Sequence, residues 1–185
     1  MFVYEVDEHI TLRQLNLQDA NQLFALIDSN RSYLREWLPW LDTNVNPDDS
    51  IAFIEHILQS YEAKKGLTAG IFYQDKLVGI AGFNAFDWTN RIGYIGYWIG
   101  QDYQGYGIIT SVVRALTDYA FTEAQLNRVD IRAAFTNKKS RAIPERLGFK
   151  EEGILRQSEW LYDHYVDHVV YGMLASDWVE NKRDQ

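Results

Sequence analysis

Residues 96–121 read GYWIGQDYQGYGIITSVVRALTDYAF, and this stretch decides the fold. It begins as an apolar, aromatic strand, passes through the turn 104–107 (QGYG), and then carries apolar residues at helical spacing. The glycines let the backbone turn tightly and let a ligand approach closely. The first N–H groups of the helix have no intrahelical partner, so this turn can bind an anion such as a phosphate.

The same turn fits neither of two common phosphate-binding patterns. No Gly-Lys-Ser/Thr follows it, which excludes a Walker A loop, and Thr110 stands where a dinucleotide fingerprint requires its third glycine. On the turn alone, a plain strand–helix connection that uses glycine for tightness remains an equal alternative.

The pattern on either side of this stretch predicts one domain, residues 1–185, of the α/β (α+β) class. We expect a mixed sheet of about seven strands with helices on both faces, in which strands 91–99 and 128–135 run parallel. The expected strands are 9–15, two within 67–87, 91–99, 128–135, 150–158 and 165–176. The expected helices are 17–28, which Asn16 can cap, a short aromatic helix after residue 30, a helix from Asp48 or Asp49 to about Lys65, 107–123 and 137–149, followed by a charged tail, 180–185.

Composition excludes several classes of protein. The net charge of −8 argues against nonspecific nucleic-acid binding, which needs clustered Lys and Arg. The chain has no cysteine, so disulfides, cysteine nucleophiles and cysteine metal sites are excluded. His164 and His168 are four residues apart, at and just before the expected strand 165–176, and they do not form an HExxH pattern, so we expect no metal. No signal peptide and no membrane span are recognisable, and we expect a cytoplasmic protein.

Three motifs together resemble one family. They are the stretch 96–121, the segment 146–149 (RLGF) with Asn137 upstream, and the segment 152–163 (EGILRQSEWLYD). These resemble the GNAT N-acetyltransferase superfamily, especially its RimJ/RimL-type members, and the resemblance covers about 9–178. It implies a GNAT fold in which the parallel strands 91–99 and 128–135 splay apart around acetyl-CoA.

The resemblance also implies how acetyl-CoA is held. Backbone N–H groups of Gln104–Ile109 would bind its pyrophosphate, and main-chain groups of Trp98–Gly100 would bind its pantetheine arm. Asn137 would bond the arm, cap the following helix, or do both. The expected cofactor-binding residues are Trp98, Ile99, Gly100, Gln104, Gly105, Tyr106, Gly107, Ile108, Ile109 and Asn137.

Acetyl transfer to an amine needs a base for the amine and an acid for the departing thiolate, but no protein nucleophile. Many GNAT enzymes use a tyrosine as the acid, and Pro144 occupies that position here. Pro144 also leaves the Ser140 carbonyl without its helical partner. The resemblance assigns the acid to Ser140 and the base to Glu159. Their structural alternatives are a helix N-terminal serine and a surface carboxylate.

On the substrate side, we expect Trp37, Trp40, Phe86, Trp160 and Tyr162 to wall an acceptor pocket, although core packing is the alternative for these rings. The resemblance favours the N-terminal α-amine of a protein of the ribosomal-protein type, and the pKa of about 8 of such an amine makes its deprotonation easier than that of lysine. A small amine such as a polyamine or antibiotic is the second reading, and a non-catalytic acyl-CoA-binding module is the third. The frequent dimers of the family are compatible with a homodimer, although the sequence does not fix the oligomeric state.

Overall fold

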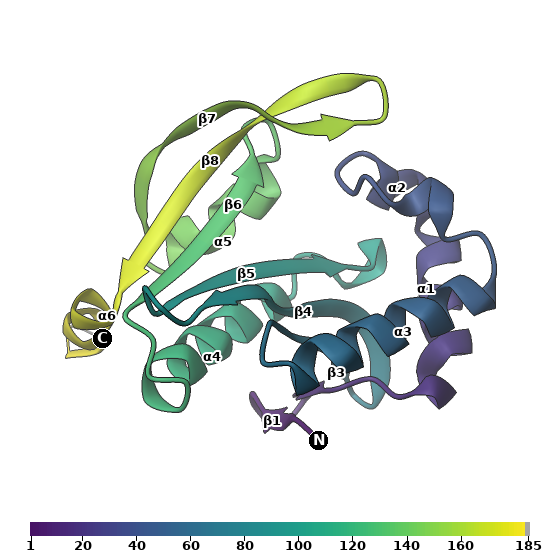
Figure 1. The fold of residues 1–185 in the computed structure, drawn as a ribbon, viewed down its shortest axis with the longest axis horizontal. Helices are drawn as coiled ribbons and strands as arrows, with labels where there is room; N and C mark the ends of the chain where they lie inside the picture. Colours follow the sequence, from purple (N-terminus) through teal and green to yellow (C-terminus); the bar gives the residue numbers. More distant parts are fainter. Residues whose placement is uncertain (184–185) are drawn as a thin grey trace.

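The computed structural model describes residues 1–183, and their strands form one sheet of eight in the order β1-β2-β3-β4-β5-β6-β8-β7 (Figure 1). All neighbours are antiparallel except β5 and β6. The strands are β1 (Val3–Glu5), β2 (Ile10–Arg13), β3 (Leu67–Tyr73), β4 (Lys76–Asp87), β5 (Ile92–Ile99), β6 (Arg128–Ala134), β7 (Lys150–Leu161) and β8 (His164–Leu174). The helices are α1 (Ala20–Ser29), α2 (Arg31–Arg35), α3 (Pro47–Glu62), α4 (Ile108–Thr122), α5 (Lys138–Arg146) and α6 (Ala175–Arg183), with short 3-10 turns η1 (Leu17–Asp19), η2 (Leu41–Thr43) and η3 (Gln101–Tyr103).

The predicted fold class is confirmed, with differences at both ends of the chain. The sheet gains β1, which pairs with β2. At the other end, the strand predicted to reach Ser176 stops at Leu174, and α6 follows. Its Trp178 is buried against Phe149 and donates its indole N–H to Asp118 at 2.7 Å, a contact that fixes the helix. Of the predicted charged tail, residues 184–185 lie outside the described part of the chain.

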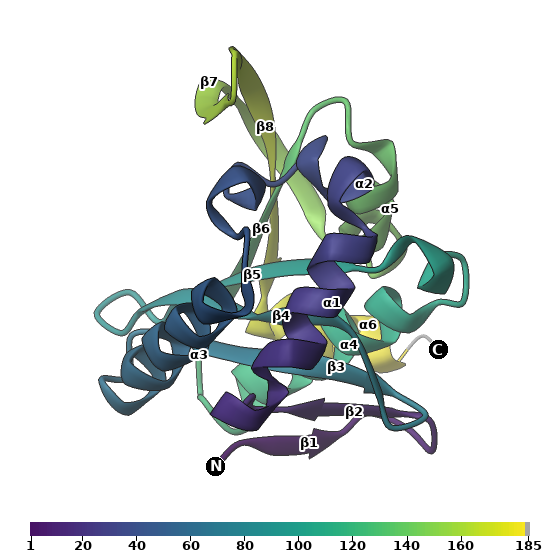
Figure 2. The same cartoon turned by 90° about the vertical axis from the view of Figure 1, so that its right-hand side faces the viewer.

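The sheet separates two hydrophobic clusters because neighbouring side chains on a strand point to opposite faces. On β3, Ile71 packs in the cluster shared with α4, and Phe72 packs in the cluster shared with α1 and α3. Ala81 and Ile80 divide in the same way on β4. Figure 2 shows α1 and α3 in front of the strands and α4 behind them.

Asparagine caps begin two of the helical segments. Asn16 caps η1 as predicted, through its side chain and the Gln18 N–H. The next long helix opens at Pro47 under the Asn46 cap, with Asp49 completing a capping box, so the predicted start at Asp48 or Asp49 was wrong by one or two residues. Over residues 1–183, no helix has both the length and the apolarity to cross a membrane.

Candidate active site

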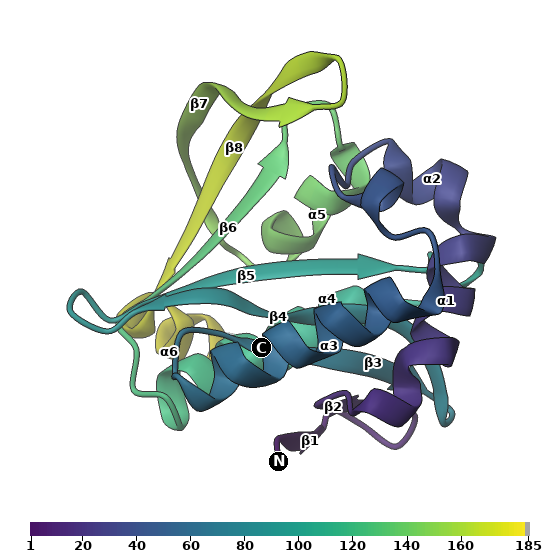
Figure 3. The ribbon, with the colours of Figure 1, turned by 45° about the vertical axis from the view of Figure 1, so that its right-hand side comes forward.

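β5 and β6 pair only over the first half of their length. Their register ends at Ile95 and Ile131, although β5 continues to Ile99 and β6 to Ala134. Figure 3 shows the two strands diverging, with α2 near the open end. Among the described residues, the β5 edge from 96 to 99 therefore lacks a strand partner on this side. The predicted divergence of the parallel pair is confirmed, and the free edge can pair with an extended ligand as with another strand.

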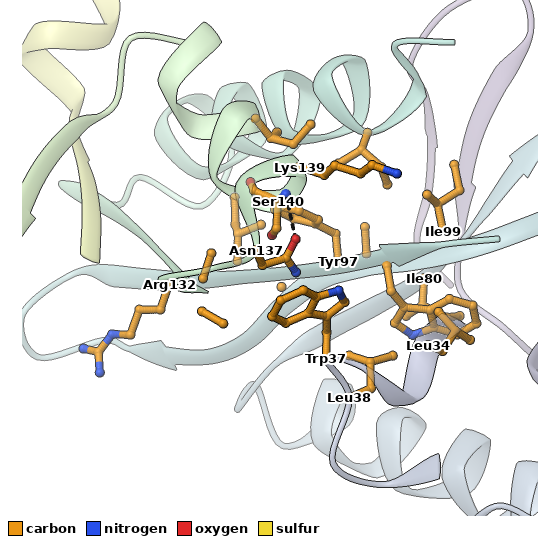
Figure 4. A pocket seen from close by; sticks show the side chains of 18 of the residues that line it. Leu34, Trp37, Leu38, Ile80, Tyr97, Ile99, Arg132, Asn137, Lys139 and Ser140 are labelled. Carbon is orange, nitrogen blue, oxygen red and sulfur yellow. Dashed lines mark hydrogen bonds between the residues drawn. The ribbon is translucent and has the colours of Figure 1, made fainter. Parts of the chain in front are cut away.

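A cavity of about 1210 Å³ occupies this gap. Ile109 of α4 and Ser140 of α5 line it from one side of the sheet, and Trp37, which follows α2, lines it from the other. Figure 4 shows Ser140 and Trp37 on opposite sides of β5. The cavity therefore passes through the sheet where the strands part, and a ligand on one side can meet a ligand on the other.

A bulge in β4 supplies a polar group to the floor of this cavity. The register with β5 shifts between Phe83 and Ala85, which leaves Asn84 outside the ladder. The Asn84 side chain lies against Gly96, where an added Cβ would come within 2.4 Å of Asn84 Nδ2. Gly96 is thus needed for close packing, and Asn84 lines the cavity.

The turn before α4 presents a row of free backbone donors. Gly105 and Gly107 have φ of +81° and +76°, the left-handed region that favours glycine. The start of α4 has no side-chain cap. Within residues 1–183, the N–H groups from Gly105 to Thr110 have no acceptor, whereas the Ser111 N–H bonds the Gly107 carbonyl. These donors and the positive end of the α4 dipole make the turn a candidate anion site at the cavity wall.

Two side chains brace the approach to this turn. Gln104 donates its amide N–H to the Tyr33 hydroxyl and accepts a hydrogen bond from Lys139 Nζ at 3.2 Å. Lys139 therefore brings a cation from α5 close to the anion site, on the same cavity wall. This charge adds to the field of the free N–H groups.

Pro144 lies inside α5, and β5 compensates for its missing N–H. The Ser140 carbonyl, which a helical residue 144 would normally bond, accepts the Tyr97 hydroxyl at 2.8 Å. Burial raises the pKa of Tyr97, so its hydroxyl stays protonated and remains a donor. This bond ties the first turn of α5 to the divergent half of β5.

Asn137 and Ser140 keep free polar groups at the cavity. Asn137 Oδ1 accepts the Ser140 backbone N–H at 3.2 Å and caps α5. In the described part of the chain, Asn137 Nδ2 and the Ser140 hydroxyl have no hydrogen-bond partner, and both residues line the cavity. Each is free to bond a ligand without giving up its structural contact.

Glu159 reaches the cavity from β7. Its Oε1 lies 3.9 Å from Nε2 of His168 on β8, and both side chains are largely buried. The register of β7 with β8 shifts between Leu155 and Glu159, which breaks the alternation of side chains. Because Glu159 pairs with Val166, two residues from His168, these three side chains share one face of the sheet.

The structure brings most of the predicted site residues together. Those that line the cavity are Trp37, Trp40, Trp98, Ile99, Gln104, Gly105, Gly107, Ile108, Ile109, Asn137, Ser140 and Glu159. Gly100 lies just outside and bonds the Val78 carbonyl, and the Tyr106 side chain points to solvent.

Phe86, Trp160 and Tyr162 do not line the cavity. Phe86 packs against Trp88 with tilted rings, and Trp160 packs edge-on against Tyr165 on the exposed hairpin β7–β8. The Tyr162 hydroxyl donates to the Leu38 carbonyl at 2.5 Å and accepts the Leu41 N–H at 3.1 Å. Tyr162 thus clamps the segment that carries Trp37 and Trp40 to the tip of the hairpin.

Several polar residues that were not predicted for this site also line the cavity. Among them are Asn84, Asp130, Arg132 and His168. The available sequence signal was a polar residue directly between two apolar residues of an expected strand, as Asn84 and Asp130 both are. Among residues 1–183, no group of three or more His, Asp or Glu side chains is arranged to hold a metal ion.

Comparisons with known proteins agree on one family. Residues 9–150 match the acetyltransferase (GNAT) domain. The putative ribosomal N-acetyltransferase YdaF of Bacillus subtilis is 40% identical, over 98% of this chain and 100% of that protein. Among solved structures, RimL, a ribosomal α-N-protein acetyltransferase in complex with coenzyme A, superposes with a TM-score of 0.90 at 25% identity, over 94% of this chain and 98% of that one. A microcin self-immunity acetyltransferase in complex with acetyl-CoA and AMP gives a TM-score of 0.88 at 32% identity, over 91% and 94%.

Proposed function

Because the chain belongs to the GNAT family of acetyl-CoA-dependent N-acetyltransferases, we propose that it acetylates the N-terminal α-amine of a protein, of the ribosomal-protein type. One observation carries this proposal: a single cavity joins the free amides before α4 to Ser140 and Glu159 through the gap in the sheet. The proposed compartment is the cytoplasm. A homodimer stays a prediction.

The residues present suit acetyl-CoA. The N–H groups of Gln104–Ile109 are the proposed pyrophosphate site, since all but that of Gln104 lack a protein acceptor in the described chain. Main-chain groups of Trp98–Gly100, at the free edge where β5 ends, would pair with the pantetheine arm, although the Gly100 N–H is already bonded to Val78. Asn137 Nδ2 would bond the same arm while Oδ1 keeps its capping role. An added Cβ at Gly105 or Gly107 would meet no protein atom, so the approach to these amides is open.

For the chemistry, we assign Glu159 as the base that takes a proton from the acceptor amine, directly or through a water. Ser140 is the acid that donates its hydroxyl proton toward the thioester sulfur as the thiolate leaves. Ser140 enters the cavity from α5 and Glu159 from β7, and the Ser140 hydroxyl makes no competing bond within the described residues. Pro144 cannot act as the acid because it has no donor.

The charges around the cavity favour an α-amine over a polycation. Its acidic lining residues are Asp130, which is paired with Arg128 and Arg132, and Glu159, which lies beside His168. A polyamine site would need several carboxylates without such partners. We therefore propose that Trp37 and Trp40 wall the acceptor half; Phe86, Trp160 and Tyr162 lie outside it.

The small-amine reading keeps one supporting observation. The similar self-immunity acetyltransferase was solved in complex with both acetyl-CoA and AMP. An amine carried by a nucleotide is therefore the second candidate acceptor for this chain, with the tryptophans as stacking surfaces.

A panel of acceptors separates these candidates. Thiol release from acetyl-CoA is followed with peptides that have free or blocked N-termini, with polyamines, with aminoglycosides and with aminoacyl nucleotides, and mass spectrometry locates the acetyl group. Faster turnover of free N-terminal peptides supports the proposal. Higher kcat/KM for any small amine than for every peptide would refute a protein acceptor.

Glu159→Gln tests the base. We expect kcat to fall by about 10²–10⁴-fold, as for loss of a general base, while the affinity for acetyl-CoA changes little. Glu151→Gln is the matched control, because Glu151 lies on the same strand but faces Arg141. An unchanged kcat in Glu159→Gln, or an equal loss in both variants, would remove Glu159 from this role.

A further inference from the structure

Arg132 lies on the acceptor side of the cavity, on the face of the sheet that carries Glu159. On β6, Asp130, Arg132 and Ala134 share one face, and Ala134 pairs with His168. The other face of β6 carries Ile131, which is buried in the hydrophobic cluster shared with α4. Arg132 therefore faces away from the side where acetyl-CoA is proposed to bind.

A buried carboxylate orients the Arg132 guanidinium. Arg132 Nε donates to Asp130 Oδ1 at 3.1 Å, and Asp130 is only 5% exposed. The other Asp130 oxygen accepts from Arg128 at 3.3 Å, and Arg128 is itself held by both oxygens of Glu152. The ring of Tyr94 lies 5.8 Å from the guanidinium carbon of Arg132. The Arg132 guanidinium, a planar fork of donors, is thus held at its Nε by Asp130, beside the ring of Tyr94.

The outer end of the same fork is free. The Arg132 side chain is 43% exposed, and its two Nη atoms have no acceptor within residues 1–183. Arg128 already neutralises Asp130 and Glu152 in part, and Glu159 has His168 beside it. Arg132 therefore offers this side of the cavity an oriented cation with unused donors, and such a fork favours a carboxylate, which it can bind through two hydrogen bonds.

The direction of the side chain limits where that carboxylate can be. In Figure 4 the Arg132 guanidinium points away from both Trp37 and Ser140. Ser140 marks the reacting end in the proposed mechanism, so the anionic group is separated from the reacting amine. An extended peptide advances by about 3.3 Å per residue, so a side chain a few residues along the chain can span this separation, whereas the α-carboxylate of a single amino acid stays next to its amine.

We propose that Arg132 is a specificity-determining residue that binds an Asp or Glu side chain within the first few residues of the acceptor protein. This inference rests on the proposed N-terminal acceptor. It adds a class of preferred sequence: a free α-amine followed closely by an acidic residue.

The test compares peptides that differ only by Glu, Gln or Lys at position 2, 3 or 4. With the wild-type enzyme we expect kcat/KM to be roughly tenfold higher for Glu than for Gln at one of these positions, mainly through KM. Arg132→Gln should reduce this ratio to about one. The side-chain amide that this substitution introduces can still donate to Asp130, so the local structure is kept and acetyl-CoA affinity should be unchanged. Arg132→Lys should keep part of the preference, and Arg132→Glu should favour the Lys peptide.

Arg114→Gln is the control for net charge, because Arg114 is exposed on α4 away from the cavity. Thermal melts establish that each variant is folded. Equal Glu and Gln rates at every position, or a Glu preference that survives Arg132→Gln, would overturn the inference while turnover of the Gln peptides still supports an N-terminal acceptor. Turnover of no peptide at all would overturn both proposals.

Discussion

The bond between Tyr97 and the Ser140 carbonyl should be a measurable part of the stability of the fold. Pro144 deprives that carbonyl of its helical donor, and the Tyr97 hydroxyl supplies one at 2.8 Å. Tyr97→Phe removes the hydroxyl and keeps the ring. The carbonyl is then left without a protein donor, which costs about 1–3 kcal/mol when the site is closed to water.

The magnitude can be read from denaturation curves. In a chain of this size, each kcal/mol shifts the melting temperature by about 2–4 °C. Burial raises the pKa of Tyr97, so the hydroxyl is a donor throughout the neutral range and the loss should not depend on pH there. Tyr106→Phe is the control, because Tyr106 is exposed and makes no hydrogen bond through its hydroxyl within the described residues; it should leave the free energy of unfolding unchanged.

A double-mutant cycle tests the reasoning itself. Pro144→Ala restores an N–H that can bond the Ser140 carbonyl, so Tyr97→Phe should cost clearly less in that background than in the wild type. Urea unfolding of the four proteins, followed by tryptophan fluorescence, gives the coupling energy. If Tyr97→Phe lowers the free energy of unfolding by amounts that agree within about 0.5 kcal/mol in the two backgrounds, Tyr97 does not replace the missing helical donor.

Two further substitutions test the turn and an ion pair. Gly107→Ala forces a side chain into φ of +76° without a clash, so we expect a loss of about 1–2 kcal/mol in unfolding free energy and weaker coenzyme A binding; calorimetry that finds neither change would contradict this. Although burial raises the pKa of Asp19, hydrogen bonds from Arg13 and the Asn16 N–H outweigh it and lower the pKa. The pair therefore stabilises the fold above the unfolded pKa of about 3.9, and this stability is lost as the pH falls further, so Asp19→Asn should flatten the acid limb of a stability–pH curve. An acid limb as steep as that of the wild type would count against this.

Much of the site follows from local sequence. The predicted family, the acetyl-CoA-dependent activity, the fold class and the divergent parallel pair are confirmed. Gly105 and Gly107 indicated a turn with positive φ, and Asn16 indicated a cap, because such features depend on a few neighbouring residues. The second long helix begins at Pro47 for an equally local reason. Asn46 is a favourable N-cap and proline is favourable at the first helical position, so the Asn-Pro pair was itself the start signal.

Other features depend on how distant segments meet. The face of Glu159 follows from a bulge in its pairing with β8, and an interrupted alternation cannot be resolved from one strand alone. Phe86, Trp160 and Tyr162 have the composition of a pocket wall, yet their rings pack elsewhere.

The sequence by itself determined most of the helices and strands and the positive-φ turn before α4, because side-chain periodicity and turn geometry depend on a few neighbouring residues. The tertiary structure decided where β5 and β6 part, which donor satisfies the Ser140 carbonyl, and that Arg132 shares a face of the sheet with Glu159. These depend on strand register and on side chains brought together across the sheet, and register is set by bulges and packing over the whole sheet.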